Sequence, residues 1–590
     1  MSFEMTTAVP LTGNSNGFFQ WMLEQNLSLL APEAIILTAI VFMFFISLSR
    51  EEKHRNSAWW VAIVYLAIAL SCLFWHLFNI YWPQTGSDLM QLTRMDWFAA
   101  PVLYGAVQAD LFGLIMRMLL VSGAGLLLFA VRPAVERNKS VLPAEFYITL
   151  MTALLGGMIL ASASDLITVF VSLETLGIAS YVLASSMRGN VASAEGGLKY
   201  LVYGGASSAC VLMGFALFYG LSGGYTDFAH VSASLQQMML SGAPESMLLL
   251  AFASVLTMVG VGFKLSAAPF HMWTPDVYEG SPLPVTAFLS VVSKVAAFAF
   301  AVRLLGNLLM PLQSLISMPI LVMAVLSMTI GNVLALVQTN LKRLLAYSTI
   351  AHAGYMLLGL YVGSQSGIGS LMFYLVTYMV MNLGAFASAM AIANMLGSEK
   401  TADYAGLFTK RPMLVLMFSI ALLSLAGIPV TSGFFAKFYL FKAVAEAGAA
   451  NVWLVVFALL NSTISLYYYI NIIRLMVVAE PSVAVAALPD KQPANVQAHQ
   501  APFATGGLML ALTLCTVVTL VLGFVSGPFY DLMMRAALPA SLPRIMPERM
   551  QANSGLEQPK PANRVVLTSY QTVPKHASAA VTDSNEATAR

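Results

Sequence analysis

The sequence predicts an all-α, polytopic membrane protein with about fourteen transmembrane helices. Of its 590 residues, 58% are hydrophobic and 9% are charged, and the mean hydropathy is +0.78. A soluble globular domain has roughly 25% charged residues. A bilayer core of about 30 Å needs roughly 20 apolar residues per helix, and apolar runs of that length recur from residue 29 to 527. These runs lack the period-two alternation of membrane β-strands, so a β-barrel is excluded.

The apolar runs set the predicted boundaries of the chain's parts. The fourteen expected spans are residues 29–48, 59–80, 103–131, 144–163, 165–186, 198–221, 247–275, 283–304, 316–337, 341–362, 369–396, 412–446, 451–478 and 505–527. The expected parts are an N-terminal segment (1–28), three first helices (29–143), a first repeat of spans 4–8 (144–304), a second repeat of spans 9–13 (316–478), a last span (505–527) and a C-terminal tail (528–590).

The two ends of the chain differ from its apolar middle. The first twenty residues lack the basic region and short apolar core of a signal peptide, so we expect them to stay on the mature chain. The stretch 528–590 is rich in Pro, Ala, Ser and charge and poor in aromatic residues. Such a composition cannot bury enough surface to order itself, which predicts a flexible tail or a strap that docks on a partner.

Charge and cysteine usage exclude several classes of partner and cofactor. The 29 Lys and Arg nearly balance the 27 Asp and Glu, and the net charge of +2 leaves no basic surface for nucleic acid. Cys72, Cys210 and Cys515 stand alone in apolar runs, with no second ligand at the spacing of iron–sulfur, zinc or c-type haem sites. We therefore expect no metal and no cofactor bound by this chain.

The loops predict the orientation of the chain in its membrane. Short loops with odd numbers contain Arg132, Arg188, Lys342 and Arg343 among other cations, whereas even-numbered loops hold little beyond Arg94. Cytoplasmic loops carry an excess of Lys and Arg. The odd loops are therefore expected on the cytoplasmic or stromal side, and both termini on the opposite side.

A few ionisable residues lie deep in the predicted spans. Glu174 is about nine residues into the fifth span, close to the midplane, and Lys294 lies at similar depth in the eighth. A charged side chain at a helix centre costs about 2.5–3.5 kcal/mol on insertion scales, so these residues indicate function. Lys199 is nearer the start of the sixth span, where snorkelling or a structural ion pair explains it equally well.

Two spans contain proline next to lysine. Lys264 precedes Pro269 in FKLSAAPFHMWTPDVYEGSP, and Lys437 follows Pro429 in LAGIPVTSGFFAKF. Proline interrupts helical hydrogen bonding, so both spans are predicted to be broken. They are the seventh and twelfth spans, five apart. Because a repeat with an odd number of spans enters the membrane in opposite directions, spans 4–8 and 9–13 are predicted to form inverted repeats.

The ionisable residues suit the transfer of protons. Desolvation moves the pKa of an ammonium group toward neutrality, and a nearby carboxylate moves it back, so a Glu–Lys pair forms a switch. His352 lies in the second repeat near the position of Glu174 in the first, and His271 lies beside the break at Pro269. His352 is equally consistent with a core histidine or a proton relay. A metal-cation path would need clustered carboxylates or carbonyls instead.

Several motifs are specific enough to indicate a family. The stretch FKLSAAPFHMWTPDVYEGSPLPVTAFLSVVSKVAAF, together with DLITVFVSLETLGIASYVL, TNLKRLLAYSTIAHAGY and SLAGIPVTSGFFAKFYLF, resembles the antiporter-like membrane subunits of respiratory complex I. Within this family the chain is most similar to the type called subunit N in bacteria and to its cyanobacterial and chloroplast counterpart. The resemblance covers about residues 30–480.

The resemblance implies roles for individual residues. It implies that Glu174 and Lys264 form the coupling pair, that Lys294 is the central proton relay and Lys437 the distal one. The family also has a lysine near the position of Lys199. Quinone, NAD(P)H or ferredoxin, and iron–sulfur clusters are then expected in other membrane and hydrophilic subunits of a complex I-type assembly, located in a bacterial inner membrane or a thylakoid membrane. The chain would contribute proton translocation to a quinone oxidoreductase without a redox centre of its own.

Two other functions remain open at this point. A Mrp-type cation/proton antiporter subunit shares the broken helices and exchanges ions without quinone. A structural scaffold would use the same lysines only to pair helices, because buried ion pairs often contribute no more than apolar replacements.

Overall fold

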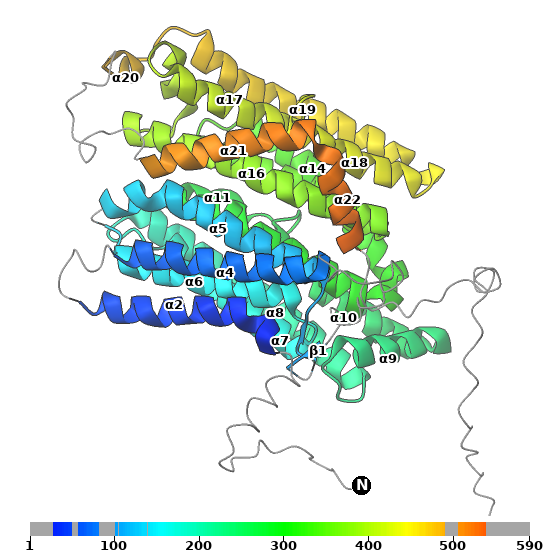
Figure 1. The fold of residues 1–590 in the computed structure, drawn as a ribbon. Coiled ribbons are helices and arrows are strands. Elements are labelled where there is room, and N and C mark those ends of the chain that lie inside the picture. The colour runs from blue at the N-terminus through cyan, green and yellow to red at the C-terminus, as the bar shows by residue number, and fades with distance from the viewer. Residues whose placement is uncertain are drawn as a thin grey trace, which may run out of the picture. The chain divides into compact units, whose positions relative to one another are not determined.

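Helices provide almost all of the regular structure in the part of the chain that the structure describes (Figure 1). A computed structural model describes residues 27–49, 57–81, 101–103, 105–137, 140–489 and 506–537. Nearly all of the predicted N-terminal segment, and residues 538–590 of the predicted tail, lie outside the described residues.

Most of the described elements are joined by short connections. In order they are η1 (Leu27–Leu30), α2 (Ala31–Ser47), α4 (Ala58–Tyr81), β1 (Pro101–Val102), β2 (Val107–Gln108), α5 (Leu111–Arg137), α6 (Pro143–Ser162), α7 (Leu166–Ala184), α8 (Val191–Leu221), α9 (Phe228–Ser241), α10 (Pro244–Leu265), α11 (Trp273–Gly280), α12 (Leu283–Ser290), α13 (Val292–Arg303), η3 (Leu304–Leu308), η4 (Met310–Leu312), α14 (Gln313–Ala335), α15 (Leu341–Val362), α16 (Gln365–Leu396), η5 (Thr401–Tyr404), η6 (Leu407–Thr409), α17 (Pro412–Ala426), α18 (Ser432–Glu446), η7 (Ala449–Asn451), α19 (Val452–Val477), α20 (Val483–Ala486), α21 (Gly506–Phe524) and α22 (Ser526–Ala536).

The prediction of an all-α polytopic protein is confirmed. In the described part, thirteen helices are long and apolar enough to cross a bilayer. The predicted twelfth span, 412–446, is the remaining one: it consists of α17 and α18, each 15 residues long, separated at the break that contains Pro429. The seventh span is broken in the same way, because α10 ends at Leu265 and α11 begins only at Trp273.

The structure corrects some predicted boundaries. The third span begins at Leu111 rather than 103, because Pro101–Val102 pairs antiparallel with Val107–Gln108. The helix α9 was not predicted. The tail does not begin at 528, because α22 continues to Ala536 and packs on the bundle. Its Tyr530 stacks on Tyr439 with ring centroids 4.0 Å apart.

Backbone contacts support the predicted pair of five-helix repeats. The first comprises α6, α7, α8, the α10/α11 pair and the α12/α13 pair, and the second comprises α14, α15, α16, the α17/α18 pair and α19. The residue before α7, Asp165, forms an antiparallel bridge with Asp227, which follows α8. The residue before α15, Asn340, forms the same bridge with Lys400, which follows α16.

The two bridges agree in their hydrogen bonds and in their helix caps. Leu166 N donates to Thr226 O at 2.9 Å, as Leu341 N donates to Glu399 O at 3.0 Å. The side chains of Asp165 and Asn340 each accept hydrogen bonds from two backbone N–H groups of the following helix. Such caps satisfy the free N–H groups at a helix start. The same local solution thus occurs once in each repeat.

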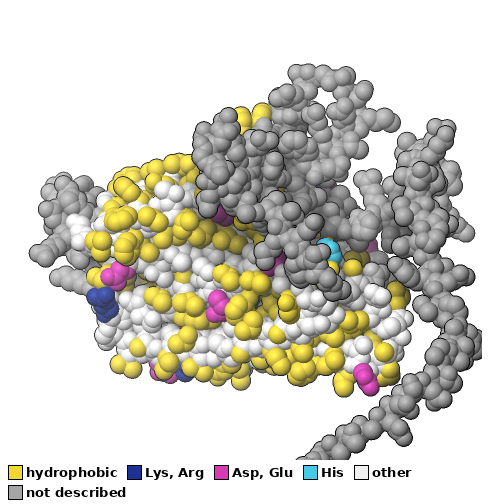
Figure 2. Space-filling view, turned by 90° about the horizontal axis from the view of Figure 1, so that it is seen from below, with side chains coloured by type: hydrophobic (Ala, Val, Ile, Leu, Met, Phe, Trp, Pro, Cys, Tyr) yellow, Lys and Arg dark blue, Asp and Glu magenta, His cyan; other side chains and the backbone are white. Residues whose placement is uncertain are grey.

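The outer surface is suited to lipid or to neighbouring membrane helices. Large apolar side chains of α2, α4, α7, α8 and α19 are exposed, and the part of the face in Figure 2 that is not covered in grey shows many apolar and few charged side chains. In Figure 1, α2, α4, α5 and α6 lie side by side, and α22 turns across the end of α16.

The inverted repeat predicts that the two bridges lie on opposite membrane faces. A cysteine introduced by Lys400→Cys should react with a membrane-impermeant maleimide from the cytoplasmic or stromal side. One introduced by His230→Cys, next to the Asp227 bridge and 64% exposed, should react only from the other side. The unmodified chain, with its own three cysteines, is the control. Labelling of both variants from one side would contradict the inverted topology.

Candidate functional site

The first helix break places a buried ammonium group against free backbone carbonyls. α10 ends with Ser266 in the left-handed conformation (φ 57°). From α13, Nζ of Lys294 donates to the carbonyl oxygen of Lys264 at 2.9 Å and to the Ser266 hydroxyl. Thr274 Oγ1 donates to the same hydroxyl at 2.7 Å, and the Trp273 ring lies 5.2 Å from Nζ. Lys294 is 1% exposed.

The second break repeats this arrangement. α17 ends with Gly427 in the left-handed conformation (φ 86°). Nζ of Lys437 donates to the carbonyl oxygens of Ala426 at 2.8 Å and Leu425 at 3.2 Å. It also donates to Ser462 Oγ of α19 at 2.8 Å, and the Tyr355 ring lies 5.2 Å away.

The two lysines therefore occupy equivalent places, although they come from different elements. Lys264 and Leu425 each lie two residues before the left-handed residue, and the carbonyl of each accepts from a lysine. The last carbonyls of a helix lack intrahelical partners and form the negative end of its dipole, so an ammonium group is favoured there. In the sequence Lys294 has no partner within its own span; the structure supplies one from α10.

Glu174 and Lys264 are neighbours without forming an ion pair. The carboxylate of Glu174 on α7 accepts a hydrogen bond from Ser208 of α8. Among the described residues no ion pair within 4.0 Å joins it to Lys264, although its charge acts on that ammonium group. Lys264 Nζ instead approaches Gly177, one turn after Glu174, where an added Cβ would lie 3.0 Å from it. The carboxylate is thus withdrawn from its predicted partner.

His352 lies in a network of hydroxyl groups within the second repeat. Its Nδ1 is 2.8 Å from the Tyr374 hydroxyl and its Nε2 is 3.5 Å from the Tyr469 hydroxyl. A second group adjoins it: Tyr468 donates to Asn332, whose amide donates to Tyr355 beside Lys437. The rings of Tyr468 and Tyr469 lie 4.4 Å apart, so the two groups together extend from the histidine to the environment of the second lysine.

Apart from His352, the hydroxyl and amide groups of this region belong to residues that the sequence analysis did not single out. Tyr374, Tyr378 and Asn382 follow one another at intervals of four on α16, with all three side chains buried. That spacing places them on one helix face, and it is the signal that could have revealed them. Ser208, the partner of Glu174, has no comparable pattern.

Lys199 belongs to a charged cluster at one end of the helices rather than to the buried row. It pairs with Asp276 of α11 and Glu195 of α8, both at 2.9 Å. Arg343 of α15 pairs with Asp276 and Glu279, both at 2.8 Å. Burial raises the pKa of Asp276, but hydrogen bonds from Lys199 and Arg343 outweigh it, so the pKa lies below its ordinary value.

The remaining candidates lie at the first break. The peptide bond before Pro269 is cis, and the segment 266–272 is not helical. His271 is buried in this segment, and its Nδ1 has no hydrogen-bond partner among the described residues. A cavity of about 220 Å³ adjoins the break, lined by Pro269, Phe270, Met272 and mostly apolar side chains of α8 and α10, with Ser207 and Cys210.

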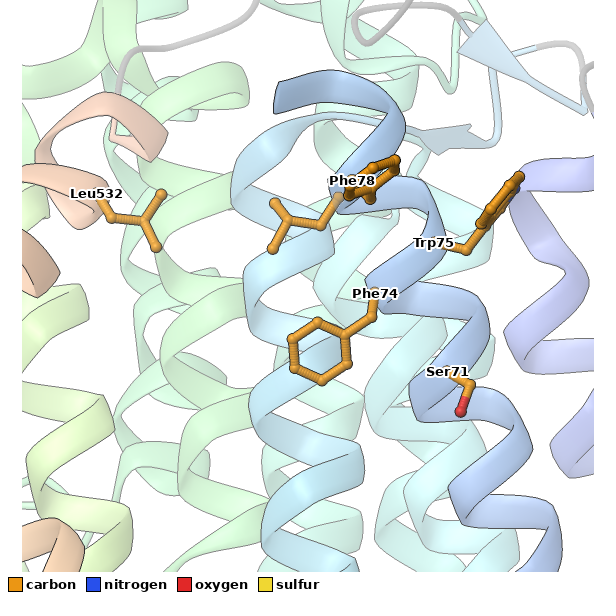
Figure 3. A pocket seen from close by; sticks show the side chains of 6 residues that line it. Ser71, Phe74, Trp75, Phe78 and Leu532 are labelled. Atoms are coloured by element: carbon orange, nitrogen blue, oxygen red, sulfur yellow. The ribbon is translucent and has the colours of Figure 1, made fainter. Parts of the chain in front are cut away.

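A larger groove lies away from these residues. It measures about 600 Å³ and is lined by Ser71, Leu77 and three aromatic side chains of α4, with Leu532 of α22 (Figure 3). Its lining is apolar apart from the Ser71 hydroxyl, which suits an acyl chain better than a polar path. Among the described residues, no group of three or more His, Cys, Asp or Glu is placed to hold a metal ion.

Comparison with known proteins identifies the family. The sequence profile described as "NADH:quinone oxidoreductase/Mrp antiporter, TM" matches residues 163–465, which include both helix breaks and all the buried lysines. The chain belongs to this family of membrane proteins.

Individual relatives resemble this chain over most of its length. NAD(P)H-quinone oxidoreductase subunit 2 of Synechococcus sp. (strain JA-3-3Ab) is 44% identical over 73% of this chain and 79% of its own length. The protein of the same name from Thermosynechococcus vestitus is 38% identical over 90% of this chain and 97% of its own.

Solved structures share the fold. A chain of respiratory complex I from Thermus thermophilus is 32% identical with a TM-score of 0.65, covering 85% of this chain and 98% of that one. A chain of the Mrp complex from Dietzia sp. reaches a TM-score of 0.70 over 87% of this chain and 97% of that one. Its identity is 20%, which shows the common fold alone.

Gly427 is predicted to be essential for the site of Lys437 as well as for the backbone. Alanine in the left-handed conformation costs about 1 kcal/mol, and at Gly427 its Cβ would also lie 2.9 Å from Lys437 Cδ. Gly427→Ala should therefore lower the thermal unfolding temperature in detergent more than Gly397→Ala does. Gly397 is the matched control, because it has φ 66° at the end of α16 with open space around it. Equal shifts would show that the lysine contact imposes no constraint.

Proposed function

We propose that this chain is a proton-translocating membrane subunit of a complex I-type NAD(P)H or ferredoxin:quinone oxidoreductase. The proposal depends on one observation above all: each of two inverted repeats places a buried lysine against the carbonyl end of a broken helix. The similarity over most of the chain to proteins named NAD(P)H-quinone oxidoreductase subunit 2 supports the same function.

The chemistry of the buried row favours protons as the cargo. Three lysines and one glutamate in apolar surroundings oppose membrane insertion by roughly 10 kcal/mol, which helix packing alone does not require. An ammonium group that is desolvated releases its proton more readily, and it repels a metal cation. The carbonyl and hydroxyl oxygens around Lys294 and Lys437 can hold either protonation state, since a hydroxyl both donates and accepts.

We assign each residue a step in this transfer. Glu174 moves between Ser208 and Lys264, and its approach holds Lys264 charged. Its withdrawal lets Lys264 pass a proton toward Lys294. His352 and its hydroxyl partners lead to Lys437 as the exit relay. Outside this row, Lys199 has a positioning role through its pair with Asp276.

The breaks are the hydrated parts of this pathway. We place His271 at an entry beside Pro269, where the non-helical backbone adjoins a cavity. The break at Pro429 would give the second half-channel the same access to water.

The redox chemistry lies outside this chain. Quinone, NAD(P)H or ferredoxin, and iron–sulfur clusters belong to other subunits, whose electron transfer drives the movement of charge here. The chain's partners are the hydrophilic and membrane subunits of that assembly, in a bacterial inner membrane or a thylakoid membrane. A Mrp-type antiporter would instead show sodium-dependent proton flux without quinone.

Lys294→Met tests the proposal directly. Methionine keeps much of the apolar stem and removes the titratable group, so the complex should assemble. Proton pumping should fall by about tenfold or more, because positioned proton-transfer groups contribute roughly 10²–10⁴-fold. The measurement is the proton-to-electron ratio of the purified complex in liposomes. Assembly with an unchanged ratio would favour the scaffold function.

The second lysine allows a matched comparison within one helix. Lys437→Met in α18 should lower the ratio, whereas Lys442→Met in the same helix should not. Lys442 is 53% exposed and pairs only loosely with Glu446, at 3.7 Å. Equal effects of the two variants would contradict a special role for the buried site.

The Glu174–Lys264 pair should depend on charge more than on reach. Glu174→Gln should impair pumping, and Glu174→Asp should impair it less, because the aspartate keeps the carboxylate. Lys264→Arg should also impair it, because a guanidinium does not release its proton. Pumping rates of the assembled complex provide the test. Equal loss in Glu174→Asp and Glu174→Gln would show that position, not charge, is decisive.

A further inference from the structure

Tyr278 stands between the two buried lysine sites and is not explained by packing alone. It lies on α11, four residues after Thr274, which hydrogen-bonds the same Ser266 hydroxyl as Lys294. Tyr278 is fully buried, and its hydroxyl makes no hydrogen bond of normal geometry within the described residues. A buried phenol usually finds a partner, because leaving the hydroxyl unpaired costs free energy.

The surroundings of this hydroxyl belong to the second repeat. Thr349 of α15 is the side chain that faces it, and the phenols of Tyr378 and Tyr200 lie within electrostatic reach of it. Tyr378 donates to Thr349 Oγ1 at 3.1 Å and accepts from the amide of Asn382 at 2.9 Å. The ring of Tyr378 is also 5.3 Å from that of His352. Tyr278 is thus the point at which α11 of the first repeat meets the hydroxyl network of the second.

Thr349 and Tyr278 each have an unused hydrogen-bonding position. A threonine hydroxyl donates once and accepts twice. Thr349 donates to the Leu345 carbonyl at 2.8 Å and accepts from Tyr378, which leaves one acceptor site. Tyr278 has an unused donor beside it. On the other side, Thr274 lies one turn earlier on the same helix, about 6 Å along the helix axis.

We propose that the Tyr278 hydroxyl is the junction through which protons pass between the Lys294 site and the network of His352. Its oxygen accepts a proton from the Thr274 side through a bridging water as its own O–H bond breaks toward Thr349 Oγ1. Thr349 takes up that proton and releases its own hydroxyl proton to the Tyr378 oxygen as the Tyr378–Thr349 hydrogen bond reverses, and Tyr378 releases its phenol proton toward the His352 side. At each oxygen one O–H bond forms and one breaks, so every hydroxyl group ends neutral and only the position of the proton changes. Protons cannot pass while the Tyr278–Thr349 hydrogen bond is unmade. They can pass once a small shift of α11 completes this bond.

This inference rests on the proposed function, and the test compares variants of the assembled membrane complex. Tyr278→Phe removes one oxygen and should lower the proton-to-electron ratio to that of Lys294→Met. Tyr147→Phe is the matched control, because it removes the same atom from another fully buried tyrosine, on α6; its ratio should be unchanged.

Thr349→Val provides an independent variant of nearly unchanged shape. If Tyr278 and Thr349 act in one route, the double variant should pump no less than either single variant. Two purely structural defects would add instead. If Tyr278→Phe does not assemble, Thr349→Val is combined with Lys294→Met instead. A double variant that pumps no less than either single variant supports one route, and additive losses contradict it.

The outcomes separate this inference from the proposed function. A normal ratio in Tyr278→Phe or Thr349→Val, with a lost ratio in Lys294→Met, would overturn the junction and leave the relay through lysines intact. A normal ratio in Lys294→Met as well would overturn both. An equal loss in Tyr278→Phe and Tyr147→Phe would also overturn the junction, because any buried phenol would then have the same effect.

Discussion

The structure depends on one constraint: a membrane helix that stops inside the bilayer leaves backbone carbonyls without partners. At both breaks a lysine ammonium group supplies the missing donors. The charge, which is costly in an apolar interior, is stabilised by the negative end of the helix dipole, and the exposed carbonyls are satisfied by the charge. Backbone and side chain therefore stabilise each other, and removing either leaves an unpaired polar group.

The two repeats reach this arrangement by different routes, and the difference gives the first repeat an additional connection. In the second, the carbonyls that accept hydrogen bonds from Lys437 belong to Ala426 and to an apolar residue, Leu425. In the first repeat, the equivalent carbonyl is that of Lys264. The side chain of Lys264 approaches Gly177 and interacts electrostatically with Glu174. The residue whose side chain lies near Glu174 is therefore also the residue whose carbonyl accepts from Lys294. Lys264 thus connects the two groups without an intervening residue.

Much of the fold followed from the sequence, because the signals are local. Apolar runs predicted the number of membrane-spanning helices, and Pro269 and Pro429 predicted where two of them are broken. The deep lysines indicated the candidate site, because their burial is costly wherever their partners lie. The partners were not predictable: Ser266, Ser462 and the carbonyl of Lys264 are contributed by other elements, and ordinary serines carry no positional signal. Lys199 shows the same limit, since only the fold reveals Asp276 beside it.

The charged cluster makes the short helix α11 a link between the two repeats. Asp276 on α11 is shared between Lys199 of the first repeat and Arg343 of the second. Because α11 is detached from α10 by the break, ion pairs and aromatic packing rather than helix continuity set its position. Trp273, stacked on Tyr200 at 4.3 Å, anchors its other end beside Lys294. Ion pairs at one end and ring stacking at the other thus hold α11 in place, and through Asp276 this half-helix joins side chains of both repeats.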